Sequence, residues 1–259
     1  MTNRDTAPAG APCWADLWTS DVEGAGRFYG ELFGWKAEEP SAEFGGYFMF
    51  TRNGVPVAGG QGDMGDAKAN NAWKVYLASP DINKTTEVAE AEGAQAAFPP
   101  MAVADLGSQT VLSDPAGNTV GVWQPVTFPG FTTLSEPGTP AWFELHTADF
   151  DRSVAFYRTT FGWETDALEG GGMNYVTVRD PSGAPMPMAG VLDIGGHDDH
   201  PAGWWVYWAV EDTDASVAKV RALGGSVLME PFDSPYGRMA VVTDPYGAQF
   251  RLNGPNTGA

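Results

Sequence analysis

The sequence predicts an α+β protein built from two tandem domains that arose by duplication. Three observations support this prediction. The segment FYGELFGW at 28–35 returns as FYRTTFGW at 156–163, and DPAG at 114–117 returns as DPYG at 244–247. Within each half, a pattern of strand, helix and several strands occurs twice. A chain of 259 residues with 43% hydrophobic residues is long enough for two packed cores.

The first half is expected to hold two units of this pattern. In its first unit Asp21 is the expected N-cap of a helix, and Gly34 has the place of the glycine that ends one. A second helix is expected at 82–94, where it ends near Gly93. The expected strands are 14–19, 46–51, 55–59, 73–78, 108–113 and 118–123.

The second half repeats these elements in the same order. Asp149 and Gly162 bound its first expected helix, and the second is expected at 214–225. Its expected strands are 142–147, 174–178, 186–190, 204–210, 237–243 and 248–253. The segment between the halves is rich in Pro, Gly and Thr, as linkers are. We therefore place the first domain at 1–125, the linker at 126–138 and the second domain at 139–259.

Composition excludes several classes of function. A formal net charge of −19 makes the surface repel nucleic acid and anionic membranes. No run approaches 18 apolar residues, and the first twelve residues contain no apolar signal segment. Cys13 is the only cysteine, so an internal disulfide is impossible. We expect a cytoplasmic protein, monomeric or homodimeric, with a small-molecule partner.

Strand alternation separates two faces of the expected sheets. Ala15 and Leu17 alternate with larger side chains, and the aliphatic face should pack on the helices. The other face collects aromatic residues, namely Trp14, Trp18, Tyr76, Trp123, Trp142, Trp205 and Tyr207. Such a face favours a pocket with aromatic walls around a few polar groups. The alternative is that these rings fill a barrel core or a domain interface.

The order of motifs resembles that of a known family. A strand, an Asp, a helix ending in FYxxxFGW, VPVAG and a unit closing in DPxG together resemble the vicinal oxygen chelate superfamily. This superfamily includes glyoxalases, bleomycin-resistance proteins and extradiol dioxygenases. The two-domain form resembles an actinobacterial glyoxalase-like branch often labelled hydroxylases. The resemblance covers about residues 12–255 and implies two tandem glyoxalase-like domains, each with two βαβββ modules that form a half-open barrel.

The resemblance also implies where metal ligands should stand. Metal-dependent members use three positions per domain, which here hold Trp14, Lys74 and Gly121, then Trp142, Trp205 and Arg251. Trp offers no lone pair, Lys is cationic at neutral pH and Arg does not lose its proton. We therefore expect no cofactor and no metal-ligand residues at these positions. A divalent metal held by other residues stays open.

Charged residues on the aromatic face are candidates for chemistry. Asp16 and Glu144 have matching positions, and His146 is on the same strand face as Glu144. A carboxyl group among aromatic rings can gain a raised pKa and transfer protons. The alternative is that each accepts hydrogen bonds from neighbours such as Lys74 or Arg251. His197 and His200 have HxxH spacing in GGHDDHP, which is more typical of a solvated loop than of a metal site.

The leading hypothesis is a protein that binds a small aromatic or apolar metabolite. The aromatic residues above would form the walls, while Lys74 and Arg251 would supply polar contacts. The alternative hypothesis is an enzyme, such as a hydroxylase, lyase or isomerase, in which Glu144, His146 and Asp16 do the chemistry. For an enzyme, the second half is the expected place of the active site.

Overall fold

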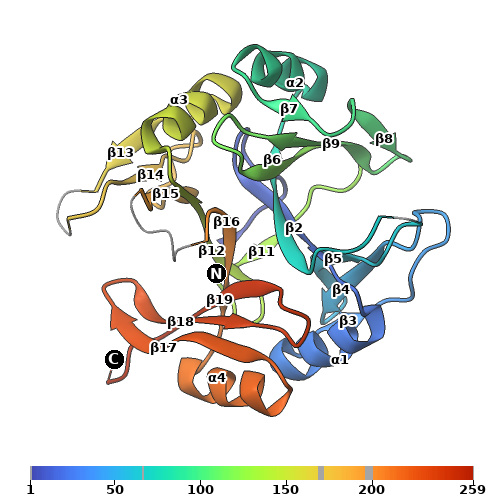
Figure 1. Ribbon diagram of the computed structural model, residues 1–259, viewed down its shortest axis with the longest axis vertical. Helices are drawn as coiled ribbons and strands as arrows, with labels where there is room; N and C mark the ends of the chain where they lie inside the picture. Colours follow the sequence, from blue (N-terminus) through green and yellow to red (C-terminus); the bar gives the residue numbers. More distant parts are fainter. Residues whose placement is uncertain (1, 66, 169–171, 196–200, 259) are drawn as a thin grey trace.

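The computed structural model describes residues 2–65, 67–168, 172–195 and 201–258. These residues form two large mixed sheets with helices on the outside of the molecule (Figure 1). The helices are α1 (Val22–Phe33), α2 (Ile82–Ala91), α3 (Phe150–Phe161) and α4 (Thr213–Ala222). Within the described part of the chain, no helix is long and apolar enough to cross a membrane. The α+β class and the two tandem domains are confirmed.

The first sheet contains both units of the first half. Its strand order is β3-β4-β5-β2-β6-β10-β9-β7, with β8 paired to β9. The strands are β2 (Pro12–Trp18), β3 (Lys36–Ala37), β4 (Phe48–Arg52), β5 (Val55–Gln61), β6 (Ala72–Ala78), β7 (Gln95–Ala96), β8 (Met101–Val103), β9 (Gly107–Ser113) and β10 (Thr119–Pro125). The antiparallel pair β2–β6 joins the two units, and β2 and β6 each pair in parallel with the last strand of their own unit.

The second sheet repeats this order as β13-β14-β15-β12-β16-β19-β18-β17. Its strands are β12 (Pro140–Thr147), β13 (Thr165–Ala167), β14 (Tyr175–Val178), β15 (Ala189–Asp193), β16 (Gly203–Ala209), β17 (Ser226–Ser234), β18 (Gly237–Thr243) and β19 (Gln249–Gly254). In the segment between the sheets, β11 (Thr133–Leu134) pairs with β1 (Thr2–Asn3). Each half is therefore one sheet of two βαβββ modules, as expected for a half-open barrel.

The first helix of each half follows the expected start and end signals. Asp21 accepts a hydrogen bond from the backbone N of Gly24 at 2.8 Å and so caps α1. Asp149 has the N-cap position of α3 but makes no side-chain cap bond. Gly34 and Gly162 follow the two helices with φ of 72° and 69°, values that favour glycine.

The repeated aromatic motif packs one domain against the other. Tyr29 of α1 lies in the first domain, and its hydroxyl donates to Oδ2 of Asp244 in the second domain at 3.2 Å. The same hydroxyl accepts from Trp73 Nε1 at 3.1 Å. The ring of Trp35 lies 4.9 Å from that of Trp208, again across the two halves. The first helix of the first domain is therefore anchored on the last unit of the second.

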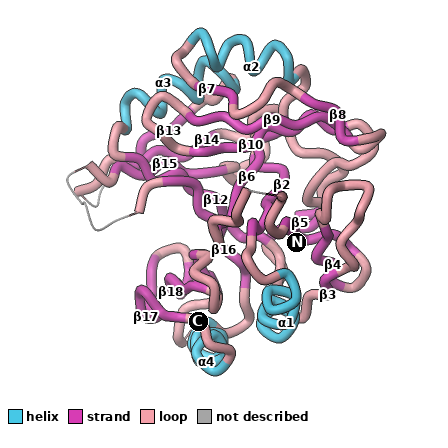
Figure 2. Tube along the Cα trace, turned by 45° about the vertical axis from the view of Figure 1, so that its right-hand side comes forward, coloured by secondary structure: helices cyan, strands magenta, loops and turns pink. Residues whose placement is uncertain are grey.

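The second copy of the motif makes the reciprocal contact. The Tyr157 hydroxyl donates to Asp114 Oδ2 at 3.2 Å and accepts from Trp204 Nε1 at 3.0 Å. Trp163 donates to the carbonyl oxygen of Gly10, as Trp35 does to that of Gly138, both at 2.8 Å. Figures 1 and 2 show the result: α1 lies beside α4, and α2 lies beside α3.

Candidate functional site

A cavity of about 1410 Å³ lies against strands β2, β6 and β10 of the first domain. Its walls include many aromatic side chains, among them Trp14, Trp18, Tyr47, Tyr76, Trp123 and Phe128. Trp205 and Gln249 of the second domain also reach the lining. Sites for small molecules combine such apolar walls with a few polar groups, so the cavity has the composition of a binding site.

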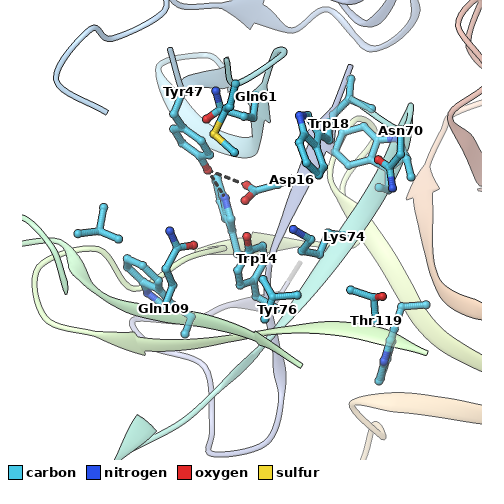
Figure 3. A pocket seen from close by; sticks show the side chains of 18 of the residues that line it. Trp14, Asp16, Trp18, Tyr47, Gln61, Asn70, Lys74, Tyr76, Gln109 and Thr119 are labelled. Atoms are coloured by element: carbon cyan, nitrogen blue, oxygen red, sulfur yellow. Dashed lines mark hydrogen bonds between the residues drawn. The ribbon is translucent and has the colours of Figure 1, made fainter. Parts of the chain in front are cut away.

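Asp16 is one of four carboxyl side chains that line this cavity, together with Glu38, Glu39 and Glu43. The Tyr47 hydroxyl donates to Asp16 Oδ1 at 2.7 Å, and Trp14 Nε1 donates to the Tyr47 hydroxyl at 2.9 Å (Figure 3). Desolvation raises the pKa of Asp16, and the hydroxyls of Tyr47 and Tyr76 oppose part of that rise. Asp16 is only partly buried and lines the cavity, so a bound molecule can reach it.

Glycine 59 allows this arrangement. Gly59 is paired with Asp16 across β2 and β5. A Cβ atom at Gly59 would lie 1.8 Å from the Tyr47 hydroxyl oxygen and 2.2 Å from Asp16 Oδ1. Gly190 has the same relation to Tyr175 in the second domain, at 1.9 Å. The glycine that ends VPVAG and MPMAG is therefore required because a tyrosine hydroxyl lies directly over the strand.

Lys74 lies beside Asp16 in the cavity. The two residues are partners across β2 and β6, and Lys74 Nζ is 5.7 Å from the centre of the Trp18 ring (Figure 3). Desolvation lowers the pKa of Lys74, and the nearby charge of Asp16 opposes that change. Among the described residues, no carboxylate lies within ion-pair distance of its ammonium group. The cavity therefore contains an acid and an amine that do not neutralise each other by direct contact.

In the second domain, the predicted residues form a closed cluster around Glu144. Its Oε1 lies 2.6 Å from His146 Nε2 and accepts from the Tyr207 hydroxyl at 2.8 Å. Its Oε2 accepts from the Tyr175 hydroxyl at 2.8 Å and from Trp142 Nε1 at 3.3 Å. Burial alone would raise the pKa of Glu144, but His146 and the two hydroxyls outweigh it and lower that pKa to about 2.

Arg251 completes the cluster from β19. It is buried, and its guanidinium carbon lies 4.8 Å from the centre of the Trp205 ring and 5.2 Å from that of Tyr207. The first domain has Gly121 at this position, where a Cβ atom would lie 2.2 Å from the Tyr76 ring. The aromatic ring therefore lies directly on the backbone in the first domain, whereas an arginine side chain fills that space in the second.

The structure thus divides the sequence-predicted residues into two sets. The cavity collects Trp14, Asp16, Trp18, Lys74, Tyr76, Trp123 and Trp205. The cluster around Glu144 collects Trp142, His146, Tyr207 and Arg251. Trp205 belongs to both, because its ring contacts Arg251 and also lines the cavity. His197 and His200 lie outside the described residues.

Tyr47 and Tyr175 were not among the predicted site residues. Tyr47 and Tyr175 each donate to the central carboxylate of their domain. The sequence contained a pattern that marks them, because Tyr47 and Tyr175 are separated by the same offset as the two aromatic motifs. Phe128, from the segment between the domains, also lines the cavity, and no repeat marks it.

The positions at which the resemblance implies metal ligands hold residues that do not fit a metal ion. Those positions hold Trp14, Lys74 and Gly121 in the first domain and Trp142, Trp205 and Arg251 in the second. None of the six is a His, Cys, Asp or Glu, the side chains that usually bind metals in proteins. Over the ranges that the structure describes, no three such side chains are grouped to hold one.

Comparisons with known proteins agree with the fold. A relative named "Putative glyoxylase CFP32" from Mycobacterium tuberculosis (strain CDC 1551 / Oshkosh) is 35% identical over 266 residues, which covers 98% of each chain. The anthracycline biosynthesis protein DauV from Streptomyces sp. (strain C5) is 35% identical over 261 residues, covering 94% of this chain and 92% of DauV.

A solved structure shows the same fold at low identity. The Mn(II)-bound glyoxalase from Novosphingobium aromaticivorans has a TM-score of 0.64 and 15% identity, with 95% of this chain and 83% of that chain covered. Residues 14–123 match the Glyoxalase-like domain family, and residues 139–252 match the Glyoxalase/Bleomycin resistance protein/Dioxygenase superfamily. With both halves matched and relatives aligned over almost the whole length, the chain belongs to the glyoxalase/bleomycin resistance protein/dioxygenase superfamily.

Proposed function

We propose that the first-domain cavity binds a small, largely aromatic metabolite. The observation that carries this proposal is the cavity of about 1410 Å³, whose aromatic walls surround the carboxyl group of Asp16 and the amine of Lys74. Aromatic rings gain from stacking on such walls, and a polar substituent can contact either charged group. The name of the relative DauV refers to anthracycline biosynthesis, and anthracyclines are polycyclic aromatic compounds.

Binding can be tested by fluorescence and thermal unfolding. Trp14, Trp18 and Trp123 line the cavity, so an aromatic ligand should change the tryptophan emission. At 100 times its Kd, such a ligand should add about 2.7 kcal/mol to the free energy of unfolding. Gln109→Trp should block the cavity that Gln109 lines, whereas Gln95→Trp, at an exposed position outside it, should not.

A panel of polycyclic and monocyclic aromatic compounds can serve as probes. The proposal requires at least one of them to stabilise the wild-type protein and Gln95→Trp but not Gln109→Trp. If every compound acts equally on both variants, the cavity is not the binding site.

The residues also support the loss of the family's usual metal centre from both domains. The support is the donor set itself, in which Trp, Lys, Gly and Arg replace His and Glu. Elemental analysis of the untagged protein tests this inference. Zinc, nickel, manganese or iron at one equivalent per chain would contradict it.

A proton-transfer enzyme is the second candidate function. Asp16 favours it, because this carboxyl group has a raised pKa and lines an open cavity. Glu144 and His146 stay candidates for the same role, although Glu144 is buried, fully engaged in hydrogen bonds and has a lowered pKa. A carboxylate with a lowered pKa is a weaker base, so Asp16 is the better acid–base group of the two.

Variants distinguish the two acid–base candidates once a substrate is known. Asp16→Asn keeps the acceptor for the Tyr47 hydroxyl but cannot transfer a proton. If Asp16 is the acid–base group, Asp16→Asn should lower kcat roughly a hundredfold or more while KM changes little. A comparable loss in Glu144→Gln, with Asp16→Asn unaffected, would assign the role to the second domain.

A further inference from the structure

Lys74 differs from the other lysines of the chain in its surroundings. The sequence contains five lysines, and all lie in the described residues. Four of them are exposed, namely Lys36, Lys68, Lys84 and Lys219. Lys74 alone is partly buried, and its side chain lines the cavity near Asp16 and Trp18 (Figure 3). Among the described residues that line the cavity, Lys74 is the one that offers an amine to a bound carbonyl compound.

The neighbours of Lys74 are those that an amine nucleophile needs. Its Nζ lies 5.7 Å from the centre of the Trp18 ring, in a cation–π contact. No described carboxylate holds the ammonium group in an ion pair. Asp16, its partner across the strands, can donate or accept a proton nearby. A lysine on the flexible end of a four-carbon chain can then reach a bound molecule without breaking a salt bridge.

We propose that Lys74 forms an imine with an aromatic aldehyde or ketone bound in the first-domain cavity, with Asp16 as the proton donor. This inference rests on the proposed function, because it assigns a carbonyl group to the aromatic ligand of the same cavity. In this proposal Lys74 and Asp16 have complementary roles. The amine of Lys74 attacks the carbonyl carbon, and the carboxyl group of Asp16 supplies the proton that dehydration requires.

The steps balance without any further reactant. The lone pair of neutral Lys74 Nζ attacks the carbonyl carbon, and one amine proton moves to the carbonyl oxygen, which gives a carbinolamine. Asp16 then protonates the departing hydroxyl group, which leaves as water while the C=N bond forms. The product is a cationic iminium, and Asp16 ends as the carboxylate that balances its charge. No oxidation or reduction occurs.

The electrostatics of the cavity agree with this sequence of steps. Desolvation lowers the pKa of Lys74, which increases the fraction of neutral amine at a given pH. Desolvation raises the pKa of Asp16, which keeps more of it protonated and able to donate. Both changes come from desolvation by burial.

Reductive trapping of the full-length protein tests the proposal. Benzaldehyde or acetophenone is added with sodium cyanoborohydride, which reduces an iminium to a stable secondary amine, and the labelled peptide is identified by mass spectrometry. We expect the label on Lys74 at roughly ten times the level on each exposed lysine. Lys74→Arg, which keeps the positive charge, should lose that label, and the matched surface variant Lys84→Arg should keep it.

Peptide mapping of the labelled wild-type protein tests the imine at Lys74 without any variant. Equal labelling of all five lysines, or labelling of exposed lysines only, overturns the proposal. Asp16→Asn should slow the labelling of Lys74 roughly tenfold, since dehydration then lacks its proton donor. If Lys74 is labelled at an unchanged rate in Asp16→Asn, Asp16 is not the proton donor for dehydration.

Binding of benzyl alcohol separates this inference from the proposed function. Benzyl alcohol has the ring of benzaldehyde but no carbonyl group, and its binding can be followed by tryptophan emission. If it binds and Lys74 is not labelled by either carbonyl compound, only the imine step is overturned. If it does not bind and no label appears, the cavity fails as a site for this class of ligand as well.

Discussion

Asp16 and Glu144 show how two equivalent carboxyl groups acquire opposite properties. Each accepts a tyrosine hydroxyl at a matching position of the first strand of its domain. Glu144 additionally contacts His146 at 2.6 Å, whereas the first domain has Trp18 there. The pKa is therefore raised by desolvation at Asp16, but at Glu144 the histidine and hydroxyls outweigh desolvation and lower it.

The lowered pKa of Glu144 predicts a loss of stability in acid. A carboxyl group whose pKa is lower in the folded than in the unfolded state stabilises the fold above its ordinary pKa of 4.5. That contribution should disappear as the pH falls from about 5 toward about 2. Urea unfolding of the wild type and of Glu144→Gln across this pH range measures this contribution, as the difference between their free energies of unfolding.

The glutamine variant should be less stable near neutral pH and less dependent on pH. Removing one partner of a buried pair costs about 3 kcal/mol. Glu90→Gln, on the exposed side of α2, is the matched control and should behave as the wild type. The assignment fails if Glu144→Gln and the wild type lose stability equally on acidification.

The close contact between Gly59 and the Tyr47 hydroxyl predicts that an alanine at position 59 destabilises the protein. In Gly59→Ala the new methyl group would lie 1.8 Å from the Tyr47 hydroxyl oxygen, so the tyrosine must move and its bond to Asp16 must break. We expect a loss of roughly 1–3 kcal/mol in the free energy of unfolding. In the double variant with Tyr47→Phe the cost should be less than additive. Strict additivity in urea unfolding would show that the two residues do not clash.

At the scale of elements, the strands and helices with one apolar face were predictable. The first strand of each domain alternates apolar and polar or aromatic residues, and the helices α1 and α3 both end at a glycine that is local in sequence. Strand β17 (Ser226–Ser234) was not predicted. Its residues are all exposed or only partly buried, so it lacks the apolar alternation that marks a strand.

The helices α1 and α3 carry the contacts between the domains, and this predicts two equivalent variants. Tyr29→Phe and Tyr157→Phe each remove a hydroxyl that joins a tryptophan N–H to an aspartate of the other domain. Each variant should lose roughly 1–3 kcal/mol of stability, because buried polar groups are left without partners. Thermal unfolding with Tyr236→Phe, at an exposed position, as control checks this expectation.

The two tyrosine variants should also be alike. A loss in one of them without a similar loss in the other would contradict the equivalence of the two interfaces. A loss in neither would mean that the hydroxyls contribute no net stability.

At the scale of the whole molecule, the reciprocal contacts make the two halves interdependent. Tyr29 and Trp35 of the first domain pack on the second domain, and Tyr157 and Trp163 pack on the first. The halves are therefore joined by aromatic contacts as well as by the chain between them. Separation would expose these rings to water, which is unfavourable for large apolar surfaces.

We therefore expect the chain to unfold in one cooperative transition. Calorimetry should give a single peak with equal calorimetric and van't Hoff enthalpies. Fragments covering 1–125 and 139–259 should each lack a cooperative transition when expressed alone. Two separate peaks for the full chain, or a stable isolated half, would show that the domains fold independently.

The sequence by itself determined the α+β class, the duplication, the order of the elements and the membership of the aromatic face. Those features depend on local periodicity, on capping residues and on the repeat, all of which can be read along the chain. Only the tertiary structure decided where the cavity of about 1410 Å³ lies among the described residues. Gly121 lets the Tyr76 ring lie on the backbone in the first domain, whereas Arg251 fills the same position in the second. The residues that close a pocket are distant in sequence, so the space left between them depends on packing that no local pattern encodes.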